Sequence, residues 1–521
     1  MLTQVESRRF SSAIILLVAT LGGLGGVARA DAGDAAVFEV RFDRKLRDEP
    51  FTGRVLIFLS AELSGEPRLT HNWLSREPIL SQDVSDWAPG QPLQLKRLQA
   101  YPYELGKIPS GKYAVQAVMH TNIDRPHSGR AAGNLYSRAK TIDFDANTSG
   151  VIRLRIGRKV KEDRHDVDTE NAKSVRIRSE CLSKFHGRDV FLRCMVALPT
   201  AYRENPTKKF PALYVIPGFG GDEREAMMYS SFLGSSKTPF VRIGLDAMCP
   251  LGHHVFADSD NNGPYGRALV EELIPHLEKE FRLISEPTAR LLTGHSSGGW
   301  SSLWLQITYP EYFGGTWSTS PDSVDFRDFC GLDLYDAKTN FFTQSSGTPW
   351  PIMRQGGSIK LLLRDFARME DVLGPGGQMQ SFEAVFGPRG EDGAPVPLWD
   401  RRTGKIDPEV VKAWRRYDIT DKLRREWKTL GPKLTGKITV IIGDADNFYL
   451  NGATELLKKA LAELGSDARV IIEPDRDHGS IMFSPSFRAM MDEMSAKFAA
   501  SHPEFEIESK ISTTQGTSND D

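Results

Sequence analysis

The stretch RLLTGHSSGGW, residues 290–300, decides the fold of this chain. An apolar run leads into the pattern Gly-x-Ser-x-Gly, which has Ser296 at its centre. A segment with apolar residues at helical spacing follows and stops at Pro310. A strand, a sharp turn and a helix in this order are the parts of a nucleophile elbow, which exposes the serine hydroxyl at its tip. The flanking glycines let the backbone take a strained turn and leave room beside the hydroxyl.

The length of the chain limits its number of domains, and its net charge bears on its partners. The chain has 521 residues, which is enough for two or three domains. Its formal net charge is −2, so the overall balance gives no reason to expect nucleic acid or an anionic membrane as a partner.

Residues 1–30 have the pattern of a secretory signal peptide. Arg8 and Arg9 supply a positive start, an apolar run interrupted by glycines follows, and Ala28-Arg29-Ala30 offers small residues at a cleavage site. The alternative is an uncleaved anchor helix, but the run is short and falls below the about 18 apolar residues that a membrane span needs. We therefore expect a secreted or periplasmic protein with no membrane attachment after cleavage.

Four cysteines bear on this expectation, because disulfides form in exported proteins. Cys181 and Cys194 flank a predicted hairpin, so either a cross-strand bridge or two free thiols is consistent with the sequence. Cys249 and Cys330 have no sequence-level reason to meet.

Residues 36–160 are predicted to form a β-sandwich domain of immunoglobulin-like kind. Short apolar or alternating runs recur without an intervening helical pattern and are separated by Gly, Pro, Asn and Asp clusters, at residues 37–42, 54–59, 113–119, 139–144 and 151–156. A charged stretch starting at Lys159 marks a linker.

Residues 170–500 are predicted to form an α/β domain. Apolar strands alternate with helical segments, which is typical of a mostly parallel sheet with helices on both faces. The expected strands are residues 175–179, 190–198, 210–216, 240–248, 291–293, 316–319, 438–442 and 468–472. The expected helices are residues 265–281, 300–309 and 452–464.

A long insertion and a polar tail complete the chain. Residues 321–437 show little strand pattern but contain amphipathic stretches at residues 359–373 and 408–430. We expect this segment to cover the site as a cap. Residues 501–521 are polar and are expected to be disordered.

A serine needs a base to take its proton, and the base needs an acid to hold its tautomer. In the elbow fold both partners follow the serine, acid first. Only His478 and His502 lie downstream, and His502 falls in the terminal stretch, so His478 is the predicted base. Asp446 is preferred as the acid over Asp444, while Asp475 and Asp477 remain alternatives.

The developing oxyanion needs two preorganised donors. The backbone N–H of Ser297 is one, and the N–H of Phe219, in the glycine-rich loop after the third strand, is the other. We also assign Asn262, Tyr265 and Trp300 to substrate binding, although residues 258–266 are equally consistent with a simple capped loop. The pair His253-His254 lacks a second ligand cluster, so we expect no metal and no cofactor.

These motifs resemble the bacterial putative-esterase family of α/β-hydrolases. That family includes enterochelin esterases, S-formylglutathione hydrolases, feruloyl and acetylxylan esterases and mycolyltransferases. The resemblance spans roughly residues 175–500 and rests on VALPTAY (196–202), PGFGG (217–221), EELIP (271–275), GHSSGG (294–299), GDAD (443–446) and DH (477–478).

The resemblance implies Ser296, Asp446 and His478 as nucleophile, acid and base, and Phe219 and Ser297 as oxyanion donors. Two features depart from the family. Pro217 stands where the family usually has histidine, and the insertion before residue 438 is longer than usual. The N-terminal region is similar to the accessory β-domain of enterochelin esterases.

Three functions are consistent with the sequence. The first is a secreted serine esterase that hydrolyses a carboxylic ester of a small molecule, a siderophore or a polysaccharide through an acyl-enzyme on Ser296. The second is an acyltransferase that passes the acyl group to a sugar or lipid hydroxyl. The third is an inert carbohydrate-binding protein, against which the ordered Ser, Asp, His set argues. The oligomeric state is not indicated.

Overall fold

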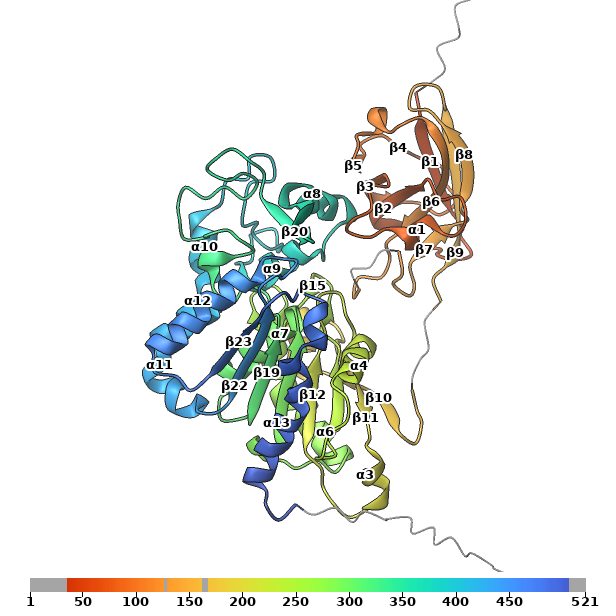
Figure 1. Cartoon of the computed structure of the whole chain (residues 1–521). Coiled ribbons are helices and arrows are strands. Elements are labelled where there is room, and N and C mark those ends of the chain that lie inside the picture. Colours follow the sequence, from red (N-terminus) through yellow and green to blue (C-terminus); the bar gives the residue numbers. More distant parts are fainter. Residues whose placement is uncertain (1–34, 126–128, 162–166, 506–521) are drawn as a thin grey trace, which may run out of the picture.

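The structure is a computed structural model that describes residues 35–125, 129–161 and 167–505. An N-terminal β-rich domain precedes a larger α/β domain (Figure 1). The predicted signal peptide lies outside the described residues, as does the chain beyond residue 505. Within the described residues, no helix combines the length and the apolar character needed to cross a bilayer.

The β-rich domain is a curled sheet of nine strands. Its strands are β1 (Val37–Phe42), β2 (Phe51–Ser60), β3 (Ile79–Trp87), β4 (Leu93–Leu95), β5 (Gln99–Tyr101), β6 (Gly111–Met119), β7 (Leu135–Ser137), β8 (Lys140–Phe144) and β9 (Val151–Lys159). They follow the order β4-β1-β9-β7-β6-β2-β3-β5, and β8 pairs with β6. Phe42 of β1 meets Trp87 of β3 at 4.7 Å between ring centroids, although these strands are not neighbours in the sheet. The sheet therefore folds over its own core, and its two layers face each other as in the predicted sandwich but are joined in one hydrogen-bonded sheet.

The α/β domain is built on an eight-stranded sheet. Its strands are β10 (Ala172–Arg178), β11 (Phe191–Ala197), β12 (Ala212–Ile216), β13 (Val241–Leu245), β18 (Arg290–His295), β19 (Gly315–Thr319), β22 (Ile438–Gly443) and β23 (Arg469–Glu473). They run in the order β10-β11-β13-β12-β18-β19-β22-β23. β10 and β11 pair antiparallel, β11 pairs antiparallel with β13, and the remaining pairs are parallel. This arrangement confirms the predicted α/β-hydrolase fold class.

Both faces of this sheet are covered because its strands are apolar on both sides. Leu213 and Val215 of β12 join a core with α4 (Glu223–Phe232) and α13 (Pro485–Ser501). Tyr214 and Ile216 point the other way, into a core with the helical segment 265–280. That segment comprises α5 (Tyr265–Ala268), a π-helical turn (Leu269–Leu273) and α6 (Ile274–Glu280). α7 (Ser297–Thr308) and α12 (Leu450–Glu463) complete the second face.

The segment 321–437 contains more strand than the sequence indicated. β20 (Pro351–Gln355) and β21 (Ser358–Leu362) form an antiparallel hairpin, so the amphipathic stretch 359–373 divides into a strand and a helix. The helices are α8 (Leu363–Leu373), α9 (Gln378–Phe386), α10 (Pro408–Trp414) and α11 (Ile419–Leu434).

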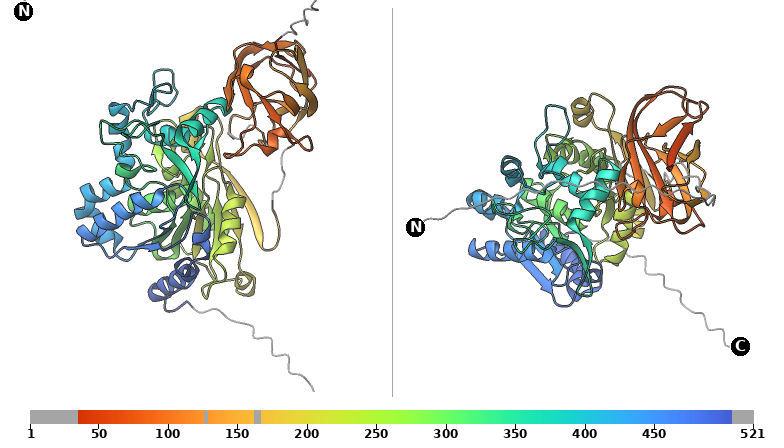
Figure 2. Two further views of the ribbon diagram at one scale, coloured as in Figure 1. Left: turned by 45° about the horizontal axis from the view of Figure 1, so that its top comes forward. Right: turned by 90° about the horizontal axis from the view of Figure 1, so that it is seen from above.

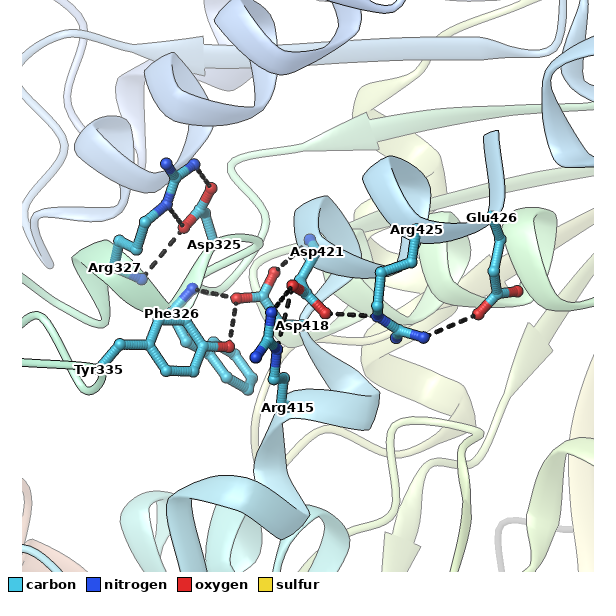
Figure 3. A network of polar contacts seen from close by, with 9 residues as sticks. All are labelled: Asp325, Phe326, Arg327, Tyr335, Arg415, Asp418, Asp421, Arg425 and Glu426. Atoms are coloured by element: carbon cyan, nitrogen blue, oxygen red, sulfur yellow. Dashed lines mark hydrogen bonds and ion pairs between the residues drawn. The ribbon is translucent and has the colours of Figure 1, made fainter. Parts of the chain in front are cut away.

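A polar network joins the start of this segment to α11 (Figure 3). The buried carboxylate of Asp418 accepts hydrogen bonds from the Phe326 N–H and the Tyr335 hydroxyl, both at 2.8 Å. It also accepts from the N–H of Asp421 at 2.9 Å and so caps α11. Arg415 and Arg425 bind the side chain of Asp421 from both sides. The chain that leaves the sheet is thereby fixed to α11.

The two domains share a core. Leu56, Phe58 and Ile79 of the β-rich domain are buried in the same cluster as Phe366 of α8. The bidentate ion pair between Arg125 and Asp246, with N–O distances of 2.9 and 2.7 Å, joins the domains at a second point. Figures 1 and 2 show the β-rich domain beside α8.

Two expectations about the chain need correction. Cys181 lies in a short helix, α2 (Glu180–His186), rather than beside a hairpin turn. All four cysteines are free, which for Cys181 and Cys194 is one of the two alternatives that the sequence left open. The start of the predicted tail is packed: the Phe505 ring meets Phe498 at 5.0 Å, and His502 stacks on Phe498 at 4.5 Å. Both side chains cover the end of α13, where the polar composition gave no sign of packing.

Candidate active site

Ser296 lies in a strained turn between β18 and α7. Its backbone has φ 58° and ψ −125°, a conformation that non-glycine residues rarely adopt. The flanking glycines are required by space. A Cβ on Gly294 would lie 2.3 Å from the carbonyl oxygen of Gly298, and one on Gly298 would lie 2.1 Å from the carbonyl oxygen of Ile216. The Gly-x-Ser-x-Gly pattern therefore forms the elbow that the sequence predicts.

Asp446 and His478 meet at the same edge of the sheet. Asp446 follows β22 and is fully buried, and its Oδ2 lies 2.7 Å from Nδ1 of His478, which follows β23. Asp446 Oδ1 also accepts a hydrogen bond from the Phe448 N–H at 2.9 Å. Burial lowers the pKa of His478, but the charge and hydrogen bond of Asp446 outweigh it, so the pKa stands above its ordinary value of 6.5. The other ring nitrogen, Nε2, is left for proton transfer.

The remaining carboxylates near His478 have other partners. Asp444 Oδ1 accepts a hydrogen bond from the Asp475 N–H at 2.8 Å and ties the two loops together. Asp477 Oδ1 accepts from the Ser480 N–H at 2.7 Å and holds a turn. Among the four aspartates considered, the structure brings Asp446 to the histidine.

A carboxylate that the sequence analysis did not single out lies beside the serine. Asp322 Oδ2 accepts a hydrogen bond from the Ser297 hydroxyl at 2.5 Å, and Oδ1 lies 3.5 Å from Ser296 Oγ. Burial raises the pKa of the Asp322 carboxyl to about 6. The described residues include no hydrogen bond between Ser296 Oγ and His478. Rotation about the Cα–Cβ bond of Ser296 would turn the hydroxyl away from Asp322, and catalytic contacts commonly tighten in this way when substrate binds.

The glycine-rich loop after β12 lies next to the serine. A Cβ on Gly218 would be 3.6 Å from Cβ of Ser296, so the loop backbone closely approaches the elbow. His253, which is buried, holds this loop: Nδ1 accepts from the Val255 N–H, and Nε2 donates to the carbonyl oxygen of Pro217 at 3.3 Å. Burial lowers the pKa of His253 to about 4, so the ring stays neutral and keeps this tautomer.

A cavity of about 230 Å³ opens at Ser296. We call the part formed by Ser296, His478, His295, Asp322 and Gly218 the reaction end. The apolar end is formed by the other lining residues: Trp73, Phe219, Cys330, Ile352, Leu361, Phe366, Gln378, Met379, Phe382, Phe448 and Leu450. Seven of them, from Cys330 to Phe382, belong to the segment 321–437, so this segment supplies much of the wall.

The three residues assigned to substrate binding lie outside this cavity. Trp300 is buried in the core between Trp304 and Phe386, at 5.2 Å from each ring. Tyr265 stacks on His254 at 3.7 Å, and the buried Asn262 N–H bonds Ser259 Oγ at 3.0 Å. Trp300 and Tyr265 pack against aromatic neighbours, and none of the three residues lines the cavity.

Sequence reasoning also missed Trp73 and Arg354. Arg354 of β20 donates from Nε to the carbonyl oxygen of Asp446 at 2.9 Å, and its N–H donates to the carbonyl oxygen of Asn447 at 2.8 Å. No local pattern marks either residue. Asp322 did have a signal, because it follows β19, the strand beside β18, and therefore lies at the carboxyl edge of the sheet. Within the described residues, no three His, Cys, Asp or Glu side chains gather as metal ligands would.

Comparison with known proteins places this chain in a family. The family model described as "Putative esterase" matches residues 189–460, more than half of the chain. A search of curated proteins gave no significant match.

Several solved structures are similar at low identity. A ferulic acid esterase is 13% identical with a TM-score of 0.40, and the match covers 63% of this chain and 99% of that one. FphF, a fluorophosphonate-binding serine hydrolase of Staphylococcus aureus, is 15% identical with a TM-score of 0.39, covering 62% and 98%. An S-formylglutathione hydrolase from Agrobacterium tumefaciens is 16% identical with a TM-score of 0.37, covering 63% and 94%. These likenesses are too distant to indicate a substrate.

Proposed function

The chain belongs to the putative esterase family, and we propose that it is an exported serine esterase that uses Ser296, His478 and Asp446. The observation that carries the proposal is the 2.7 Å contact between Asp446 Oδ2 and His478 Nδ1 in the cavity that Ser296 enters from its strained turn. A carboxylate on Nδ1 fixes the tautomer in which Nε2 is free to accept a proton.

The reaction follows from these positions. Nε2 of His478 takes the proton of the Ser296 hydroxyl as the oxygen attacks the ester carbonyl. The N–H groups of Ser297 and Phe219 stabilise the oxyanion. The protonated histidine then gives its proton to the departing alcohol, which leaves an acyl group on Ser296. Water, deprotonated by the same histidine, releases the acid and restores the hydroxyl.

Export belongs to the same proposal and is supported by the signal-peptide pattern of residues 1–30. The substrate is an ester of a small molecule or a polysaccharide, and an acyl-enzyme that reacts only when a sugar or lipid acceptor is added would instead make the protein a transferase.

The proposal is tested at Ser296. A fluorophosphonate probe should label the wild-type protein, and Ser296→Ala should remove both the labelling and the hydrolysis of p-nitrophenyl acetate, with kcat/KM falling by at least about 10⁴-fold. Ser302→Ala is the matched control, because it removes a hydroxyl from the same helix that bonds only the Gly299 carbonyl oxygen, at 2.9 Å. Turnover that survives in Ser296→Ala would end the proposal.

A further inference from the structure

One residue of the cavity wall comes from the β-rich domain. Trp73, in the connection between β2 and β3, lines the cavity together with residues of the α/β domain. Its ring contacts three other aromatic residues, each from a different part of the site. The centroid of the Trp73 ring lies 6.0 Å from that of Phe219, in the glycine-rich loop after β12, and 5.2 Å from that of Phe366 of α8. It lies 5.9 Å from that of Phe448, in the loop after β22 that carries Asp446, which we call the acid loop. Trp73 therefore joins the walls that surround Ser296.

The segment that carries Trp73 is held in place by its own hydrogen bonds. We call residues 61–78 the tryptophan loop. Asn72 Oδ1 accepts from the Leu74 N–H at 2.9 Å, and the Asn72 carbonyl oxygen accepts from the Ser75 N–H at 3.0 Å, so Trp73 lies within a closed turn. At the base, the carboxylate of Glu77 accepts from the Ala61 N–H and the Thr70 hydroxyl, both at 3.2 Å. The indole is thus presented on a preformed turn.

The position of the tryptophan loop relative to Ser296 is fixed by the contact between the domains. Arg54 of β2 donates to the carbonyl oxygen of Asp371, at the end of α8, at 2.6 Å. The Arg125–Asp246 ion pair binds the domains on another side. With the shared core, these contacts hold the strands that carry the tryptophan loop against the α/β domain.

The chemistry of the apolar end indicates what it receives. Its lining is aromatic and aliphatic, with Gln378 as its amide, and none of the described lining residues is lysine or arginine. The volume of 230 Å³ is below the roughly 300–1,000 Å³ of pockets that hold a whole drug-sized ligand. The cavity therefore suits the uncharged apolar group on one side of an ester.

We infer that Trp73 is a specificity-determining residue of the esterase: supplied by the β-rich domain, it limits the length of the apolar group that fits beside Ser296. The inference rests on the proposed function. Removing the indole opens the wall where the tryptophan loop enters, so longer groups gain room. Each methylene that becomes buried raises the relative kcat/KM by about fourfold.

The test compares p-nitrophenyl esters from acetate to decanoate in the full-length protein. In Trp73→Ala, the ratio of kcat/KM for octanoate to that for acetate should rise at least about tenfold above the wild-type ratio. Trp73→Phe keeps an aromatic ring and should raise the ratio in the same direction by a smaller factor. Leu74→Ala is the matched control: Leu74 is the next residue of the turn, is 48% exposed, and does not line the cavity. Its ratio should equal that of the wild type.

Several outcomes would overturn the inference. An unchanged ratio in Trp73→Ala, or an equal loss for every ester, would mean that Trp73 does not select the chain length. If the alanine variant fails to fold, which its melting temperature shows, an unchanged ratio in folded Trp73→Phe is decisive instead. Hydrolysis of p-nitrophenyl acetate that is lost in Ser296→Ala supports the proposed function even when the inference fails. A wild-type protein that hydrolyses none of the esters overturns both.

Discussion

The reaction end and the apolar end of the cavity are built from different kinds of sequence. Ser296, Asp446 and His478 follow β18, β22 and β23, parallel strands of one sheet whose carboxyl ends meet at one edge. The apolar end takes Trp73 from the tryptophan loop and six of its eleven lining residues from residues 352–382, none of which belongs to that sheet. The sheet therefore positions the reacting groups, whereas the segments inferred above to set the substrate range lie outside it.

The largest loss of activity is expected at the reaction end. Asp446→Asn should lower kcat by roughly 10³–10⁴-fold, because an amide no longer fixes the Nδ1–H tautomer of His478. Asp446 also raises the pKa of His478, so its loss should move the acidic limb of the kcat/KM profile to lower pH. Profiles between pH 5 and 9 measure both effects.

Asp444→Asn is the control for that prediction. Asp444 lies in the same loop, and the asparagine oxygen can still accept the hydrogen bond from the Asp475 N–H. Wild-type kcat and an unmoved acidic limb are expected. A loss in Asp444→Asn as large as that in Asp446→Asn would contradict the assignment of the acid.

An intermediate effect is expected at Arg354, which links the apolar end to the reaction end. Arg354 belongs to the segment 321–437, yet it holds the backbone of the acid loop through the Asp446 carbonyl oxygen. Arg354→Met should lower kcat about tenfold, less than the roughly 10²-fold that a 1 Å displacement of a catalytic group can cost. The acidic limb should stay in place because the Asp446–His478 contact remains. The exposed Arg364 of α8 offers the control Arg364→Met, and equal losses in both variants would argue against a positioning role.

The smallest expected effect on rate concerns Asp322. Its charge contributes to the raised pKa of His478, but less than that of Asp446 does. Removing a buried negative charge destabilises the protonated imidazole, so Asp322→Asn should lower the pKa of His478 and move the acidic limb to lower pH, by less than Asp446→Asn does. At pH 8, kcat should fall by far less than the roughly 10²–10⁴-fold that a general acid–base group supplies. A limb that moves to higher pH would contradict this assignment.

The fold of the α/β domain could be predicted because its signals are local. Apolar runs such as residues 210–216 and 438–442 identify buried strands, and the elbow motif supplies both a strand and a helix start. Signals were weaker elsewhere. β3 lacks a continuous apolar run because its exposed positions are polar. The β20–β21 hairpin lies beside the helical pattern of α8, which dominates that stretch.

The candidate site divides in the same way. The order of Ser296, Asp446 and His478 along the chain predicts their meeting, since the sheet brings their loops together. Trp73 reaches the cavity through a contact between domains, which no motif encodes. The elbow motif likewise does not show that Trp300, near the start of α7, packs in the core.

The core shared by Leu56, Phe58 and Ile79 with α8 has a consequence for the history of the chain. A recombination event that exchanged only one domain would leave half of an apolar surface against a partner that had not evolved to cover it. The domains are therefore expected to be inherited together. New substrate preferences would then arise more readily by point changes in residues 61–78 than by replacement of the whole N-terminal module.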